Sequence, residues 1–84
     1  MYKCPCCGYY TIGEKPPGTY EICPVCFWED DHVQYQEPDL DGGANELSLN
    51  QSRMNFKKFR ASEKRFITRV RPPKDDELQG EEWE

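Results

Sequence analysis

Long apolar runs are absent from this sequence, and hydrophobic residues are scarce in general. They make up 36% of the 84 residues, and the mean hydropathy is −1.00. No stretch approaches the roughly 20 apolar residues that cross a bilayer, and the N-terminus lacks the apolar run of a secretory signal. We therefore expect a cytoplasmic protein with no membrane segment. Its core must be thin, because a domain of this size hides only about 60% of its unfolded surface.

Histidine is also scarce, which limits the catalytic chemistry that we expect. His32 is the single histidine, and it follows Glu29, Asp30 and Asp31. A catalytic interpretation would make His32 a base and the acids an oxygen-liganded metal site, but no nucleophile or second histidine completes it. We therefore expect no enzyme. The three acids are interpreted as solvated carboxylates that pair with basic side chains of a later helix, or as contacts for a basic partner.

Cysteine, in contrast, is abundant and regularly spaced. Four of the five cysteines form two Cys-x-x-Cys pairs separated by fifteen residues, a spacing typical of a four-thiolate metal site: Cys4, Cys7, Cys23 and Cys26. In a reducing compartment such pairs indicate metal or redox chemistry more often than disulfides, and an odd number of cysteines agrees. Two thiolates three residues apart can chelate one ion from a tight turn, and two such turns complete a tetrahedron.

The metal that we expect is zinc, with one ion per chain, because zinc fits a closed four-thiolate tetrahedron and needs no redox partner. Iron is the alternative, since "CPCCGY" and "CPVC" also resemble rubredoxin knuckles. A closed site is structural rather than catalytic. Its binding energy, on the order of 10 kcal/mol or more, exceeds the expected stability of so small a fold, so we expect the metal-free chain to be largely unfolded.

Cys6 is the fifth cysteine, and it is left over. Gly8 follows Cys7 and can take the positive φ that such turns commonly need, which assigns Cys4 and Cys7 to the metal. The second pair has Phe27 at the equivalent position. Cys6 is interpreted as a thiol that does not bind the metal, and the alternative is a reactive thiol or a ligand that exchanges with a neighbour.

The remaining sequence predicts a small metal-stabilised α+β fold, a zinc ribbon of the rubredoxin type followed by one amphipathic helix and a short extended segment. Residues 9–12 and 19–22 are aromatic and β-branched, and they predict a β-hairpin with a proline-containing loop over 13–18. Phe27 and Trp28 are expected in the core. Residues 36–47 lack periodicity and predict a loop. Ser48 and Gln51 form a capping-box pattern that begins the helix.

The segments define the expected domain organisation. One domain covers residues 1–71, with the ribbon over 1–47, the helix over 48–61 and an extended segment over 64–71. The sequence "RFITRV" alternates apolar and basic residues, which predicts an edge strand that ends at Pro72 and Pro73. Residues 72–84 are expected to be an acidic, flexible tail.

Charge is sorted along the chain. Residues 1–47 contain two lysines and nine acids, whereas residues 48–71 contain eight lysines or arginines and one acid, so their net charges are −7 and +7. Opposite charges on one short chain favour internal pairing. The net charge of −5 that remains for the whole chain would favour a basic protein partner. The alternative is a basic helix that contacts nucleic acid or another polyanion, through Arg53, Lys57, Lys58, Arg60, Lys64 and Arg65.

Four stretches carry a resemblance to a known family: "CPCCGYYT", "YEICPVCFWEDD", "GGANELSLNQSR" and "VRPPKDDE". Together they touch most of residues 4–77, and on them the chain resembles the small bacterial cysteine-rich CPCC family. The resemblance implies a zinc-binding ribbon followed by a helix, with Cys4, Cys7, Cys23 and Cys26 at the ligand positions, and it implies no activity. Family members often have Gly-Ala where this chain has Arg60 and Ala61.

Three functional hypotheses follow from these features. The first is a non-enzymatic, metal-stabilised module that binds another protein, such as an inhibitor or immunity-type partner of a basic toxin or nuclease. The second is a nucleic-acid-binding ribbon that uses the basic helix, and the third is an iron or thiol redox protein. Small size, acidic balance and a closed site favour the first. The oligomeric state stays open.

Overall fold

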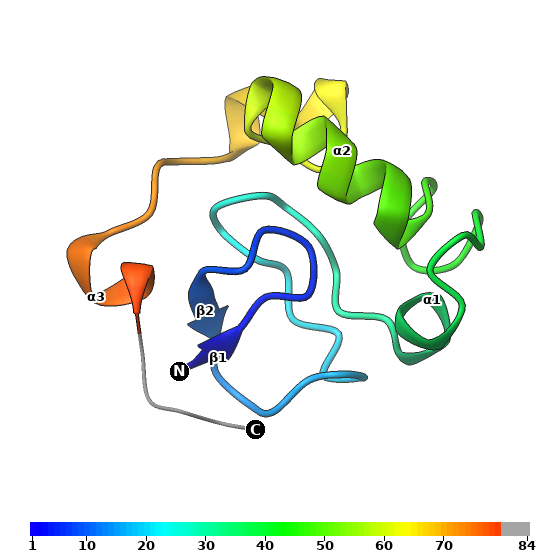
Figure 1. Ribbon diagram of the computed structural model, residues 1–84, viewed down its shortest axis with the longest axis horizontal. Coiled ribbons are helices and arrows are strands. Elements are labelled where there is room, and N and C mark those ends of the chain that lie inside the picture. Colours follow the sequence, from blue (N-terminus) through cyan, green and yellow to red (C-terminus); the bar gives the residue numbers. More distant parts are fainter. Residues whose placement is uncertain (80–84) are drawn as a thin grey trace.

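Short elements of secondary structure surround two cysteine-containing turns in the computed structural model, which describes residues 1–79 (Figure 1). The elements in chain order are β1 (Tyr2–Lys3), β2 (Tyr10–Ile12), α1 (His32–Gln36), α2 (Leu49–Phe59), the 3₁₀ helix η1 (Lys64–Arg69) and α3 (Asp75–Leu78). The predicted α+β class and the amphipathic helix are confirmed. Within residues 1–79, no helix combines the length and the apolar character needed to cross a membrane.

The two cysteine turns share one backbone pattern. In the first turn, the Cys4 N–H donates to the Tyr9 carbonyl at 2.8 Å, and in the second the Cys23 N–H donates to the Trp28 carbonyl at 2.9 Å. Each turn therefore closes its own small hairpin, with β1 and β2 antiparallel around the first turn and an isolated antiparallel bridge around the second.

The predicted hairpin between residues 9–12 and 19–22 is wrong. β2 pairs with β1, with Tyr2 opposite Ile12. Residues 19–22 instead pair with the segment that follows the second cysteine turn, with Ile22 opposite Glu29. The physical reason is that each cysteine turn brings its two flanking segments together, which uses their backbone hydrogen-bonding groups locally. The segment over 13–18 therefore links two hairpins.

Positive φ angles follow both cysteine pairs. Gly8 has a φ of 82°, as the sequence predicts, and Phe27 adopts the same conformation with a φ of 70°. A residue other than glycine is strained at a positive φ. Packing of Phe27 against Phe66, with 4.5 Å between ring centroids, helps to offset this strain. The second turn therefore keeps its shape without glycine.

The core lies between the second turn and α2. Trp28 is buried at its centre, as predicted, together with Ile12, Val25, Leu49 and Phe56. Phe27 lies at the edge of this core and is half-buried. Burial of these few apolar side chains supplies little hydrophobic free energy for a chain of this length.

α2 begins after Ser48, as the sequence predicts, and ends at Phe59, two residues before the end of the predicted helix. The Ser48 hydroxyl accepts the Gln51 N–H at 3.1 Å, whereas the Ser48 N–H donates to the Asp41 carboxylate at 2.8 Å. The second half of the expected capping box is thus supplied by the preceding loop. Arg60, which caps the C-terminal end of the helix, has a left-handed φ of 66°. Its guanidinium stacks over the Phe56 ring at 4.2 Å, which helps to offset the strain at this position.

The predicted extended segment over 64–71 is wrong, because residues 64–69 form η1. Two hydrogen bonds explain the difference, since the Ser62 N–H binds the Cys26 carbonyl and the Arg71 N–H binds the Pro24 carbonyl. These carbonyls are at most about 7 Å apart along the chain, whereas nine residues of strand span about 30 Å. A 3₁₀ helix, which rises about 2 Å per residue, shortens the path.

A helical turn, α3, forms at Asp75–Leu78, where the sequence predicted an acidic tail over 72–84. Residues 80–84 lie outside the described residues. Glu77 is buried and receives two hydrogen bonds from the Arg71 guanidinium, each 2.8 Å long. These bonds, together with the Lys74 N–H, lower the pKa of Glu77 from 4.5 to about 2 despite burial.

Replacing Arg71 with Gln is expected to raise the pKa of Glu77 from about 2 towards 4.5. Because the folded-state pKa lies below the unfolded value, ionised Glu77 stabilises the native protein above about pH 4.5, and this contribution is lost as the pH falls towards 2. An NMR titration of the Glu77 carboxyl carbon measures the shift. A midpoint near 4.5 in the unmodified protein would contradict the ion pair.

A buried polar network connects α1 to the loop before α2. The Gln34 amide donates to the Asn45 carbonyl at 3.1 Å and accepts from the Asn45 N–H, also at 3.1 Å. The Asn45 side chain in turn pairs with both backbone groups of Glu29. Gly43 lies against this network, and a Cβ there would lie 2.7 Å from Asp31 Oδ2. The loop over 36–47 is therefore a fixed support for α2.

Candidate metal centre

The two turns bring together four sulfur atoms, those of Cys4, Cys7, Cys23 and Cys26. All four lie within 4.8 Å of one another. The shortest distances join one turn to the other, with 3.6 Å between the Cys4 and Cys26 sulfurs and 3.7 Å between those of Cys7 and Cys23. All five cysteines are free thiols.

These sulfur positions fit a tetrahedral metal ion. Metal–sulfur bonds of about 2.3 Å place the corners of a tetrahedron about 3.8 Å apart, close to the shortest sulfur–sulfur distances here. The remaining sulfur–sulfur distances are at most 4.8 Å, so the four cysteines are grouped closely enough to hold one metal ion. Zinc and iron both accept such a set of thiolates, so the distances do not distinguish them.

Hydrogen bonds from the backbone point at three of the sulfurs. The N–H groups of Cys6, Val25 and Trp28 lie 3.4 Å from the sulfurs of Cys4, Cys23 and Cys26 respectively. Such bonds stabilise the negative charge of a thiolate and orient it towards the ion. The tight turns thus supply donors as well as ligands.

The free thiols have strongly shifted pKa values. Burial raises the pKa of Cys4 and Cys26, and hydrogen bonding to Cys23 raises that of Cys7. Hydrogen bonds from Cys26, Cys4 and Cys7 lower the pKa of Cys23. A bound cation would supply the positive charge that lets the buried thiols ionise.

Cys6 lies outside the cluster that can hold a metal. Its side chain is buried against the core, at the position that Val25 occupies in the second turn. Burial in an apolar setting agrees with the interpretation of Cys6 as a packed thiol, because reactive cysteines are partly exposed.

The acidic residues after the second turn are used inside the protein. Asp30 is fully buried and accepts hydrogen bonds from the N–H and hydroxyl of Thr19. Asp31 is buried and caps α1. Burial opposes its ionisation, but hydrogen bonds from the N–H groups of Ala44, Gln34 and Val33 outweigh it and lower its pKa. Asp30 and Asp31 are therefore not available to a basic partner, and the prediction that they pair with the helix is wrong.

Most of the basic residues of α2 and η1 form no ion pair with residues 1–79. Among residues 1–79, the single ion pair between the acidic and basic segments joins Arg65 to Glu46 at 3.8 Å. The expected internal pairing of the two segments is therefore wrong. Lys57, Lys58 and Lys64 are exposed. Arg53 is half-buried and donates to the Pro5 carbonyl at 2.9 Å, so it ties α2 to the first turn.

Thr11 is a site residue that the sequence did not single out. Its hydroxyl lies 3.0 Å from the Cys23 sulfur, and its position just after the first turn in β2 brings it to the second turn across the cluster. A threonine in a short strand carries no sequence signal of its own, because the contact depends on how the two turns face each other.

Replacing Thr11 with Val is expected to lower metal affinity about tenfold, because the Cys23 thiolate loses a hydrogen-bond donor. Competition between the protein and a chelator for Zn²⁺ measures the change. Thr11→Ser keeps the hydroxyl and should retain most of the affinity, and Thr68→Val tests an exposed threonine elsewhere. Equal affinity for Thr11→Val and the unmodified protein would show that the hydroxyl does not support the ligand.

The comparisons with known proteins agree with the resemblance seen in the sequence. Residues 2–77 match the sequence pattern of the family described as cysteine-rich CPCC. Among curated proteins, none matches the chain. Because the matched region covers nearly the whole sequence and includes both cysteine turns, the chain belongs to the cysteine-rich CPCC family.

Proposed function

We propose that this protein is a non-enzymatic, zinc-stabilised module that acts by binding another protein. The observation that carries the proposal is the set of four sulfurs, all within 4.8 Å of one another. Four thiolates complete the coordination of zinc and leave no position for substrate or water. A metal held in this way would stabilise the fold, and with it a binding surface, and would not take part in catalysis.

The metal turns are connected to the rest of the chain by backbone contacts. The Cys26 and Pro24 carbonyls accept hydrogen bonds from Ser62 and Arg71, which flank η1. The Pro5 carbonyl in the first turn accepts a hydrogen bond from Arg53 of α2. A bound ion would therefore fix α2 and η1 relative to the turns, and these elements carry the surface that a partner would contact.

The identity of the metal is the first test. The purified protein is expected to be colourless and to contain one zinc ion per chain by elemental analysis. A coloured preparation with one iron per chain would overturn the zinc assignment and favour the redox hypothesis. Cys6→Ser serves as the matched control, since it removes a thiol outside the cluster and should leave the metal content unchanged.

Nucleic-acid binding is the second candidate function, and the free cations on α2 and η1 favour it. Lys57, Lys58 and Lys64 have no ion-pair partner among residues 1–79. Electrostatic binding to DNA or RNA would weaken steeply with added salt. No binding of labelled DNA or RNA, single-stranded or duplex, at low salt would exclude this function. An inhibitor or immunity-type role remains a form of the first proposal, in which the partner is a toxin or nuclease.

A further inference from the structure

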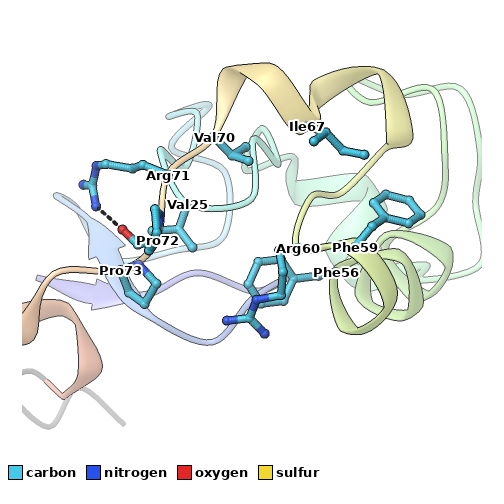
Figure 2. A pocket seen from close by; sticks show the side chains of 9 residues that line it. All are labelled: Val25, Phe56, Phe59, Arg60, Ile67, Val70, Arg71, Pro72 and Pro73. Carbon is cyan, nitrogen blue, oxygen red and sulfur yellow. Dashed lines mark hydrogen bonds between the residues drawn. The ribbon is translucent and has the colours of Figure 1, made fainter.

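An open apolar groove lies between α2, η1 and the chain that follows η1 (Figure 2). Its volume is about 210 Å³. Phe59 of α2, Ile67 of η1 and Val70 contribute side chains that remain partly or largely exposed, and Ile67 is 43% exposed. Val25 and Phe56 are buried beneath them. The groove thus presents apolar surface that residues 1–79 do not cover.

The charged side chains that line the groove have one sign. Two arginines and no acid line it. The guanidinium of Arg71 points away from the other lining side chains in Figure 2, where the dashed line is its hydrogen bond to the Pro72 carbonyl. It also binds Glu77, which leaves Arg60 as the lining cation without an acidic partner among residues 1–79. Glu63, the one acid of residues 48–71, is buried and paired with Arg65 at 2.7 Å. The α2 and η1 sides of the groove are therefore basic, whereas the exposed Asp75 and Asp76 follow Pro73 at its other end.

We propose that this groove binds an acidic peptide segment of a partner protein, with one aliphatic or aromatic side chain inserted between Phe59 and Ile67 and a carboxylate at Arg60. The volume suits a single side chain, because a cavity of about 150 Å³ already holds benzene, and it is smaller than the roughly 300 Å³ or more of cofactor pockets. Apolar anchors surrounded by charge complementarity are typical of peptide-binding grooves.

A peptide explains the groove better than a nucleic acid does. Single-stranded nucleic acids are typically held by several aromatic side chains that stack successive bases. Among the residues that line the groove, Phe59 is the one partly exposed aromatic ring, because Phe56 is buried and the Arg60 guanidinium lies over it at 4.2 Å. A polynucleotide would also leave the apolar side chains of Ile67 and Val70 without a partner. The groove therefore selects a ligand that is both acidic and apolar.

The inference rests on the proposed function, because the second cysteine turn forms one wall of the groove. Val25 stands between Cys23 and Cys26, and the Pro24 carbonyl holds Arg71 at the groove edge. An ion bound by the four cysteines would thereby fix the shape of the groove.

Selection from a display library of random twelve-residue peptides on the zinc-loaded full chain tests the proposal. The enriched peptides are expected to be acidic and to share one aliphatic or aromatic residue. Ile67→Ser is expected to weaken binding of an enriched peptide about tenfold. Met54, which is 54% exposed on α2 and lies outside the groove, provides the control, and Met54→Ser should weaken binding about twofold or less.

Arg60 offers a second variant, in which relief of backbone strain offsets the lost contacts of the guanidinium with Phe56 and Tyr9. Arg60→Gly removes the guanidinium and relieves the positive φ, so it should weaken peptide binding about fivefold while the melting temperature is maintained. Lys57→Ala removes a cation of α2 that does not line the groove and should have a smaller effect.

Several results would overturn the inference. The first is a selection that enriches basic peptides or enriches no peptide. The second is an equal peptide affinity of Ile67→Ser and the unmodified chain. The third is self-association of the chain that Ile67→Ser abolishes. DNA that binds more tightly than every enriched peptide, with no effect of Ile67→Ser, would also overturn it. Metal content and melting temperature are measured on the same samples. Zinc-loaded, folded protein without peptide binding would reject only the groove, whereas folded protein without metal would reject the proposed function.

Discussion

Removal of the metal with a strong chelator is expected to abolish the folded state. The apolar core is small, whereas the binding energy of a structural zinc site is on the order of 10 kcal/mol or more, which exceeds the total stability expected for so short a chain. Loss of amide dispersion in the ¹H–¹⁵N NMR spectrum and of far-UV circular dichroism measures the unfolding. Addition of Zn²⁺ should restore both signals.

Cysteine variants separate the ligands from the extra thiol. Cys23→Ser removes a buried sulfur that also contacts Thr11 and should leave the chain largely unfolded even with excess Zn²⁺. Cys6→Ser should fold and bind one ion, because Cys6 is outside the cluster. A chelator-treated protein that kept a well-dispersed spectrum would contradict the structural role of the metal.

Asn45→Ala is expected to lower the free energy of unfolding by about 2–4 kcal/mol. The side chain makes three hydrogen bonds, to both backbone groups of Glu29 and to the Gln34 amide. Its removal would leave the two partly buried backbone groups of Glu29 without this partner, whereas the Gln34 oxygen would keep its hydrogen bond from the Asn45 N–H. Denaturant unfolding at a fixed Zn²⁺ concentration measures the loss.

Asn50→Ala is the matched control for this network. Asn50 makes an exposed side-chain hydrogen bond to Asp39, so its replacement should cost about 0.5 kcal/mol or less. If the two variants lost the same small amount of stability, the network would be no more important than a surface contact. The loop over 36–47 would then not be a fixed support for α2.

Local signals in the sequence predicted the parts of the protein that depend on neighbouring residues. The two Cys-x-x-Cys pairs identified the four sulfurs that the fold brings together, because each pair is closed by a turn of a few residues. Ser48 and the apolar face of the following residues marked α2. Trp28 was placed in the core correctly, since a large apolar side chain next to a buried ligand has few other places to go.

Contacts between distant segments were not predictable in the same way. The pairing of β1 with β2 was missed because two residues of strand carry almost no periodic signal. The alternating sequence of residues 64–71 predicts a strand, because the anchoring of the segment that contains η1 to the Cys26 and Pro24 carbonyls is a long-range contact. Asp30 and Asp31 read as surface charges, since nothing in the sequence indicates that backbone N–H and hydroxyl groups enclose them.

The self-contained closure of each cysteine turn has a consequence for the order of assembly. Both turns are closed by hydrogen bonds between residues only a few positions apart, so each can form early, on the timescale of local chain motion. Either pair of thiols can then capture an ion first. The second pair needs only to close the intervening segment, whose entropic cost grows slowly with length. Metal loading would therefore proceed in two steps, through a half-ligated species that stopped-flow mixing with Co²⁺ could detect by its absorption.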